Sequence, residues 1–284
     1  MAIIKRSGEK TIAPVQVSLP TEKSKPVTDL GGYSILFYGK KKIGKTTMCQ
    51  HFPSTIFLMH EPGGKKLSIF QKPVRSWNEF RQYVKLLQVD TRFKTVVVDP
   101  VDISYDMCMA YVCTKLNIIH PSEADWGKGW SAVKKEFMGE MNKLLNSGKG
   151  IIFISHMREE TIEERGQKSY QRRTNTMSGQ AKEAIEGVVD VWACYDYLAN
   201  KRYLTILGDD FTDAGHRLNE APGARFLHTD GTPVRHINMG KTSKEAYENF
   251  LKGFNNQLIK EVANVVNVKA VESKVSQGKK LGSR

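Results

Sequence analysis

The stretch Gly39-Lys-Lys-Lys-Ile-Gly44-Lys45-Thr46 constrains the fold of this chain more than any other, because it has the complete GxxxxGK[ST] spacing of a phosphate-binding loop. An apolar segment that predicts a strand, Tyr33–Tyr38, comes directly before it, and a segment that predicts a helix, Lys45–Phe52, begins at its end. In this setting the glycines allow a tight loop whose N–H groups point at phosphate oxygens, and the positive end of the helix lies at the same place. The sequence therefore predicts a nucleotide site between a strand and a helix.

The residues of this loop have separate expected tasks. Lys45 is expected to reach the β- and γ-phosphates of ATP from an exposed position, and the Thr46 hydroxyl is expected to join the shell of a Mg²⁺ ion. ATP and Mg²⁺ are the cofactors that the motif indicates. The full set expected to surround the phosphates is Gly39, Lys40, Lys41, Lys42, Ile43, Gly44, Lys45, Thr46 and Thr47.

A second ligand for Mg²⁺ is expected where a neighbouring buried strand ends. The segment Lys94-Thr-Val-Val-Val-Asp99 places a carboxylate at the end of an apolar strand. Such a run alone is a weak signal, but the phosphate loop upstream favours Asp99 as the acid that holds the metal. Asp102 is expected to cap the helix that follows.

Between Gly32 and about Gly208, short apolar stretches alternate with longer amphipathic ones. This alternation predicts an α/β fold with a mainly parallel central sheet flanked by helices. The expected strands are Tyr33–Tyr38, Thr55–Met59, Thr95–Val98, Gly150–Ser155, Val188–Cys194 and Tyr203–Leu207, and the expected helices are Lys45–Phe52, Trp77–Gln88, Ile103–Leu116, Trp130–Leu145 and Gly179–Ile185.

Composition divides the chain into three parts. Residues 1–31 are polar, contain several prolines and hold one strand-like stretch, so they predict an N-terminal arm. Residues 32–240 form the expected nucleotide-binding core. Residues 241–284 predict a helix over Lys244–Val266 followed by a basic tail without fixed structure.

The charge of the chain indicates a polyanion as partner. Lys and Arg number 43 against 30 Asp and Glu, a formal net charge of +13. Residues 251–284 alone hold seven Lys and Arg against two Glu. Such an excess favours nucleic acid over a small-molecule substrate. The apolar runs are too short to cross a bilayer, and the four cysteines form no CxxC pair, so we expect a cytoplasmic protein with reduced thiols and no membrane partner.

Two more polar residues follow expected strands. Glu61 comes shortly after Thr55–Met59, and His156 comes directly after Gly150–Ser155. Taken in order, the phosphate loop, Glu61, Asp99 and His156 resemble the RecA core. The resemblance implies that Glu61 polarises the water that attacks the γ-phosphate and that His156 senses the γ-phosphate. Read without the resemblance, Glu61 is a turn carboxylate and His156 a strand-end histidine.

The segments Ala124-Asp-Trp-Gly-Lys-Gly-Trp130 and Gly179–Val191 are similar to phage RecA-core ATPases of the Sak-type single-strand annealing group, and the similarity covers about residues 32–220. It implies ATP-dependent binding of single-stranded DNA in phage recombination, slow Mg²⁺-dependent hydrolysis and a homo-oligomer, either ring or filament. It also implies a phage single-strand-binding protein as a partner, in the cytoplasm of an infected bacterium. Arg217 lies where the resemblance places a cation that completes the site of a neighbouring subunit.

The RecA core touches DNA with two loops, which correspond here to Asn117–Trp130 and Arg158–Gln180. Both stretches offer cations and aromatic rings, as binding to single strands without sequence preference requires. Core packing of the tryptophans and solvated arginines are the alternative interpretations, and the acidic residues between Glu159 and Glu164 argue against a uniformly basic surface. The candidate DNA-binding residues are Trp126, Lys128, Lys168, Tyr170, Arg172 and Arg173.

The leading hypothesis is therefore an ATP-dependent protein that binds single-stranded DNA and hydrolyses ATP slowly. A DNA-binding module that ATP switches with negligible hydrolysis is the second hypothesis, and a helicase or loader motor is another. A small-molecule kinase is disfavoured, because the sequence shows no separate lid segment with paired arginines and such a substrate does not require a net charge of +13.

Overall fold

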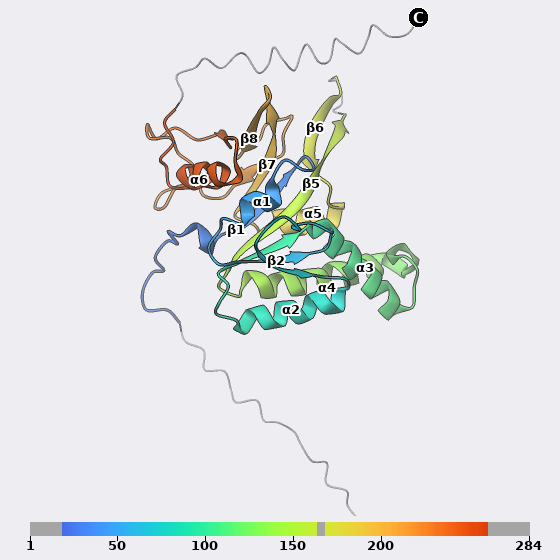
Figure 1. The fold of residues 1–284 in the computed structure, drawn as a ribbon. Coiled ribbons are helices and arrows are strands. Elements are labelled where there is room, and N and C mark those ends of the chain that lie inside the picture. The colour runs from blue at the N-terminus through green and yellow to red at the C-terminus, as the bar shows by residue number, and fades with distance from the viewer. Residues whose placement is uncertain (1–18, 164–167, 261–284) are drawn as a thin grey trace, which may run out of the picture.

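A computed structural model of the chain, which describes residues 19–163 and 168–260, contains one mixed sheet that is parallel over most of its width (Figure 1). Its main path runs in the order β10-β8-β7-β1-β5-β4-β2-β3, while β6 pairs with β5 and β9 with β7. The strands from β3 to β7 along this path are parallel, and β8 and β10 extend one side in antiparallel pairing. The strands are β1 (Ser34–Gly39), β2 (Thr55–Met59), β3 (Phe70–Pro73), β4 (Thr95–Asp99), β5 (Gly150–Ile162), β6 (Tyr170–Asn175), β7 (Val191–Leu198), β8 (Lys201–Thr205), β9 (Gly215–His216) and β10 (His236–Asn238).

Helices cover both faces of this sheet. The first and the last helix, α1 and α6, pack on one face, and α2 to α5 pack on the other. The α-helices are α1 (Lys45–Cys49), α2 (Trp77–Val89), α3 (Val101–Leu116), α4 (Lys128–Leu145), α5 (Gly179–Glu186) and α6 (Ser243–Phe254), and short 3₁₀ turns lie at Leu30–Gly32, Pro121–Glu123 and Asp125–Gly127.

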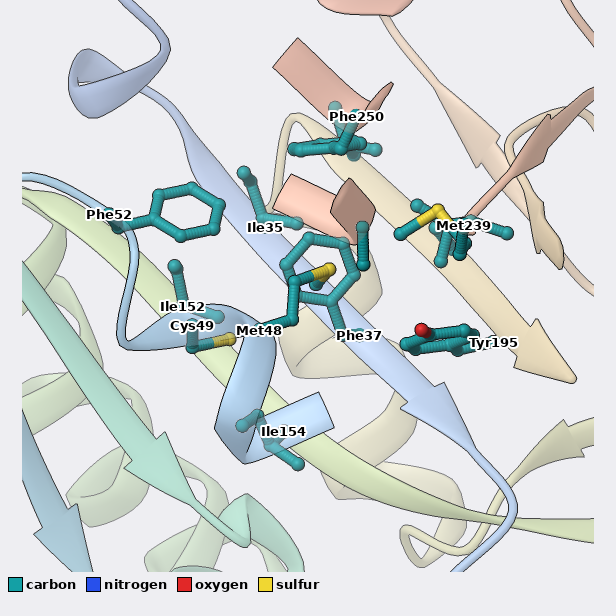
Figure 2. Packing of buried hydrophobic residues seen from close by; sticks show 14 of the residues in the cluster. Ile35, Phe37, Met48, Cys49, Phe52, Ile152, Ile154, Tyr195, Met239 and Phe250 are labelled. Atoms are coloured by element: carbon teal, nitrogen blue, oxygen red, sulfur yellow. The ribbon is translucent and has the colours of Figure 1, made fainter. Parts of the chain in front are cut away.

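Alternate residues of the central strands form two separate cores. In β1, Ile35 and Phe37 join the cluster beneath α1 and α6, while Leu36 joins the cluster beneath α2 to α5. Figure 2 shows the first cluster, in which Phe250 of α6 packs near Phe37. Because side chains alternate across a strand, a strand covered on both faces must be apolar at every position. This explains the continuous apolar runs, and the predicted α/β fold is confirmed.

The predicted loop over Arg158–Gln180 is wrong. β5 continues past His156 to Ile162 and pairs antiparallel with β6, so that the stretch forms a β-hairpin. In this hairpin Glu159 is in register with Arg173 and Glu160 with Arg172. Opposite charges at directly opposed positions stabilise an antiparallel pair. Glu159 and Glu160 therefore belong to a strand.

Two predicted helices end earlier than expected. α1 ends at Cys49, because Pro53 disfavours helical backbone at the residue before it and cannot donate a hydrogen bond. α6 ends at Phe254, and Asn256 then adopts a left-handed backbone with a φ of 60°. A left-handed residue is a common helix stop. Residues 261–266 of the predicted helix, like the strand-like stretch of the arm before residue 19, lie outside the described residues.

Two smaller expectations concern cysteines and membranes. Cys49, Cys108, Cys113 and Cys194 are all buried, free thiols, as expected. Within the described ranges, no helix combines the length and the apolar character that a bilayer crossing needs.

Candidate functional site

The phosphate loop lies between β1 and α1, at the carboxyl edge of the sheet. Lys45 is buried rather than exposed, since its side chain folds back under the loop. Its Nζ donates hydrogen bonds to the carbonyl oxygens of Gly39, at 2.8 Å, and Lys40, at 2.9 Å. The expectation of an exposed lysine is therefore wrong. Burial lowers the pKa of Lys45 to about 8, although the charge of Asp99 acts in the opposite direction.

Two glycines of the loop have geometric reasons to be glycine. A Cβ atom on Gly39 would lie 2.0 Å from the carbonyl oxygen of Tyr195 on β7, so no side chain fits between these strands. Gly44 has a φ of 114°, which a residue with a side chain rarely adopts. The motif spacing and the local backbone thus agree.

The two expected Mg²⁺ ligands lie side by side. The Thr46 hydroxyl donates a hydrogen bond of 2.6 Å to Asp99, whose carboxylate is buried at the end of β4. Burial raises the pKa of the Asp99 carboxyl, while the hydrogen bond from Thr46 and the charge of Lys45 act to lower it. In the described part of the chain no group of three acidic, histidine or cysteine side chains could hold a metal. One carboxylate and one hydroxyl nevertheless fit Mg²⁺, which usually keeps waters and takes its other ligands from phosphates.

Glu61 and His156 meet at the same edge of the sheet. In the strand register His156 lies opposite Gly39, and Asp99 lies opposite Met59, two residues before Glu61. His156 Nε2 lies 3.6 Å from Glu61 Oε2, too far for a hydrogen bond. Both ring nitrogens of His156 are buried without a hydrogen-bond partner in the described structure. Buried polar atoms of this kind usually find a partner, so the site has capacity for a further polar group.

A hollow of about 380 Å³ opens beside the start of α1. A volume of this order suits a small ligand. The hollow borders Thr46 and Thr47 of the loop and the segment that follows Glu61. The lining residues are Thr46, Thr47, Pro62, Gly63, Gly64, Lys65, Lys66 and Leu67.

The candidate DNA residues of the second stretch lie on or beside β6. Arg172 forms an ion pair of 3.6 Å with Asp213, and Arg173 one of 3.7 Å with Asp196. The Tyr170 ring packs edge-on against Phe211. These side chains are thus engaged within the protein, whereas Lys168, two residues before the strand, is exposed.

The candidate residues of the first stretch lie at the junction of α3 and α4. Trp126 is 96% exposed and has a left-handed backbone with a φ of 56°. Lys128 is exposed at the start of α4. Trp130 is half-buried and packs edge-on against the exposed His120, outside both hydrophobic cores. The two groups of candidates therefore lie on separate elements, since the junction of α3 and α4 lies apart from β6 (Figure 1).

Arg217 lies at the opposite edge of the sheet from the phosphate loop. Its backbone N–H donates to the carbonyl of Asp190, just before β7, and its guanidinium donates to the carbonyl of Gly187. The side chain is exposed. From this position it does not reach the nucleotide site of its own chain.

Asp102 does not cap α3, because Pro100 occupies the N-cap position. Its Oδ1 instead accepts hydrogen bonds from Ser155, at 3.0 Å, and from Thr176, at 2.7 Å. The carboxylate thus joins α3 to β5 and to the segment that leaves β6. The correction follows from tertiary contacts that the local sequence does not contain.

Two residues near the site had no place in the sequence prediction. Asp196 is buried on β7, and its carboxylate lies 2.9 Å from the Lys40 ammonium. An acidic residue so close to an apolar run could have indicated Asp196, but the strand predicted from the sequence ended at Cys194. Arg202 of β8 places Nη1 3.4 Å from the position that a Gly44 Cβ would take, while its other nitrogens donate to the Gly240 carbonyl. No local signal marks Arg202, which follows a tight turn between β7 and β8.

Comparison with known proteins agrees with this geometry. A family model described as "AAA domain" matches residues 31–218, which include β1 to β9 and α1 to α5. The SPbeta prophage-derived uncharacterized protein YorG of Bacillus subtilis strain 168 is 29% identical over 138 residues. The aligned part covers 46% of this chain and 43% of that protein, so the chain spans less than half the length of this relative.

Proposed function

The chain belongs to the AAA domain family, and from this premise we propose that it is a Mg²⁺-dependent ATPase that binds single-stranded DNA. The meeting of three strand ends, those of β1, β2 and β4, with His156 in the middle of β5 carries the ATPase part of the proposal. Lys45, the Thr46–Asp99 pair and the Glu61–His156 pair all lie at one edge of the sheet. Open parallel sheets bind their ligands at this edge.

The residues divide the proposed reaction among them. Lys45 leaves the two loop carbonyls and neutralises the β- and γ-phosphates. Thr46 and Asp99 hold Mg²⁺, which supplies charge neutralisation when it is bound. Glu61, about half exposed, orients the attacking water and accepts its proton. His156, whose ring nitrogens are free to bond, donates to the γ-phosphate and lies at the base of the hairpin.

Charge and exposed side chains support the DNA-binding part of the proposal. The net charge of +13 favours a polyanion. Trp126, which is almost fully exposed, offers a face on which a base can stack, and Lys128 lies two residues away. The similarity to a prophage-derived protein supports a phage setting in a bacterial cytoplasm. Annealing of the Sak type, with a phage single-strand-binding protein as partner, is the most specific part of this proposal.

We further propose that the active form is a homo-oligomer in which Arg217 completes the nucleotide site of a neighbouring subunit. Its exposure and its distance from the site of its own chain support a contribution in trans. An additional cation would stabilise the charge that develops in the transition state. The Arg217→Ala variant should then lose turnover while it keeps ATP affinity.

Calorimetric ATP binding and phosphate release, each with and without single-stranded DNA, test the proposal. Lys45→Ala should abolish tight ATP binding, whereas Lys85→Ala, which removes an equal charge from α2, should not. Glu61→Gln should keep ATP affinity and lose turnover by about 10²- to 10⁴-fold, since it removes only the proton acceptor. Equal ATP affinity in Lys45→Ala and the unchanged protein would contradict the nucleotide site. Binding without phosphate release would favour the ATP-switched module, and ATP-driven strand displacement would favour a motor or loader.

A further inference from the structure

A buried carboxylate joins the phosphate loop to the β5–β6 hairpin, which we define as Met157–Ile162 paired with Tyr170–Asn175. Asp196 of β7 is 5% exposed. One of its oxygens lies 2.9 Å from the Lys40 ammonium, and the other lies 3.7 Å from Nε of Arg173. The same carboxylate accepts a hydrogen bond of 2.7 Å from the backbone N–H of Tyr197, which fixes its orientation. Asp196 is therefore shared between a cation of the phosphate loop and a cation of the hairpin.

The loop side of this contact continues to the proposed phosphate-binding lysine. Lys45 donates to the carbonyl oxygen of Lys40, at 2.9 Å, so that the position of Lys40 depends on where the Lys45 ammonium lies. The Tyr38 hydroxyl, near the end of β1, lies 3.2 Å from the carbonyl oxygen of Arg173 and closer to that of Asp213. Polar contacts thus run without interruption from the phosphate loop to β6.

We propose that Asp196 is a positioning residue that couples occupancy of the phosphate loop to the arrangement of the hairpin. The proposal rests on the proposed nucleotide binding and does not require DNA. A triphosphate attracts Lys45 away from the Lys40 carbonyl and attracts the Lys40 ammonium, whose side chain is 51% exposed. Asp196 then faces Arg173 alone, and a buried carboxylate that loses one cation holds the other more strongly. Nucleotide thereby favours one hairpin arrangement over another.

A second acid that is paired with the hairpin offers a matched control for this role. Asp213 forms an ion pair of 3.6 Å with Arg172 and one of 2.8 Å with Lys182. Its carboxylate therefore holds the hairpin to α5 and has no ion pair with the phosphate loop among the described residues. A merely structural carboxylate at Asp196 should behave as Asp213 does.

Hydrogen exchange of the hairpin amides, measured with and without Mg²⁺ and a non-hydrolysable ATP analogue, tests the coupling. In the unchanged protein saturating nucleotide should alter the exchange of these amides several-fold. Asp196→Asn, which keeps the bond to Tyr197 and removes the charge, should bind the nucleotide with an affinity within about threefold of the unchanged protein and lose this response. Asp213→Asn should exchange faster in both states and keep the response.

The outcomes separate the coupling from the proposed function. If the unchanged protein does not bind the analogue, the nucleotide site itself is wrong. If it binds the analogue and the hairpin exchange does not change, or if Asp196→Asn keeps the full response, the coupling is overturned. Should Asp196→Asn fail to fold, Lys40→Gln at saturating nucleotide takes its place, because it removes the other half of the contact from an exposed side chain. Loss of the hairpin response supports the coupling there, and a full response overturns it.

Discussion

At the scale of single residues, Lys45 shows how burial sets the behaviour of a site. Its ammonium is held by two backbone carbonyls, and burial lowers its pKa to about 8. Between about pH 8 and the ordinary pKa range of a lysine, the unfolded chain binds more protons at this side chain than the folded protein does. Through this lysine, stability therefore rises as pH increases across that window. A bound triphosphate reverses the preference, because phosphate oxygens favour the charged ammonium.

Nucleotide binding should consequently take up a proton at alkaline pH. We expect the uptake of about one proton at pH 9 and almost none at pH 7, and a nucleotide affinity that falls by up to about tenfold per unit above pH 8. Calorimetry in two buffers of different ionisation enthalpy measures this uptake. Lys45→Arg is the control, since a guanidinium keeps its proton and whatever affinity the variant has should not depend on pH. Equal proton uptake at the two pH values would contradict the assignment.

Glu186, at the end of α5, titrates near neutrality. Burial raises its pKa to about 7, and the charge of Asp213 adds to this, while Lys182 and a hydrogen bond from Asn175 act to lower it. The folded protein therefore binds more protons than the unfolded chain between about pH 4.5 and 7, and the contribution of Glu186 to stability falls as pH rises through that window.

Glu186→Gln should accordingly stabilise the protein by about 1–2 kcal/mol at pH 8 and have almost no effect at pH 4.5. The glutamine keeps an oxygen that accepts from Asn175, whose bond to Glu186 is 2.6 Å long. Thermal unfolding at both pH values measures the difference. Glu183→Gln, which alters a side chain 75% exposed on the same helix, should show no such dependence on pH. A variant that is stabilised equally at both pH values would refute the titration.

At the scale of elements, the sequence predicted most of the central fold and missed the parts that depend on distant partners. Thr55–Met59 was predicted with its observed bounds, because a strand buried on both faces is apolar throughout. The strand Phe70–Pro73 was missed, since it lies at the sheet edge and is mostly exposed. The hairpin was missed because its strands are mostly polar and show no alternation of apolar and polar residues. Only the opposite charges of Glu159 and Arg173, which are in register in the hairpin, indicated the pairing. The strand–loop–helix geometry at Gly39–Thr46 was predictable because the motif is local, whereas Asp196 and Arg202 reach this loop only through folding.

The last helix, α6, belongs to the core rather than to an appendage. Phe250 is fully buried and packs edge-on against Phe37 of β1, with ring centroids 5.3 Å apart. The helix also contacts the turn that follows α1, where Ser243 Oγ lies 3.0 Å from His51 Nε2. The family match ends at residue 218, so this covering of α1 is built by a part of the chain that the match does not include.

Phe250→Ala should therefore destabilise the whole protein. Removal of a fully buried phenylalanine costs about 3–5 kcal/mol. Urea unfolding should show a single transition with a lower midpoint and an unchanged slope. Lys252→Ala, on the exposed side of the same helix, should change stability by less than about 0.5 kcal/mol. A Phe250→Ala midpoint equal to that of the unchanged protein would mean that α6 is dispensable.

At the scale of the whole molecule, the carboxyl ends and the amino ends of the parallel strands hold different candidate groups. The carboxyl edge holds Lys45, Asp99, Glu61 and His156, and the hairpin extends beyond it (Figure 1). Arg217 lies at the other edge. If the amino ends of the strands in one subunit pack against the carboxyl ends in the next subunit, each proposed nucleotide site faces a neighbouring subunit. Such head-to-tail packing is compatible with a ring and with a filament, the two assemblies between which the sequence did not decide.

Binding of single-stranded DNA should depend steeply on salt and ignore sequence. Neutralising about five phosphates of a single strand should give a log–log slope of about −3.5. Loss of either exposed lysine, Lys128 or Lys168, should reduce the magnitude of this slope by about 0.7. Replacement of Arg172 and Arg173 should change the slope less, because both are already paired with buried or half-buried acids.

Trp126→Ala separates stacking from charge in the same titrations. Trp126 is 96% exposed, so its replacement by alanine should leave the thermal midpoint unchanged. The variant should bind DNA more weakly by about 1–3 kcal/mol. The salt slope should stay the same, because stacking releases no counterions. Fluorescence anisotropy with oligonucleotides of two unrelated sequences, at four salt concentrations and with saturating nucleotide, measures both quantities. Equal affinity for single strands and duplex, or a slope near zero, would show that phosphate and base contacts do not hold the DNA. A normal slope that neither lysine alters would instead move the contact surface to the basic segment after residue 251, which holds seven of the 43 Lys and Arg residues.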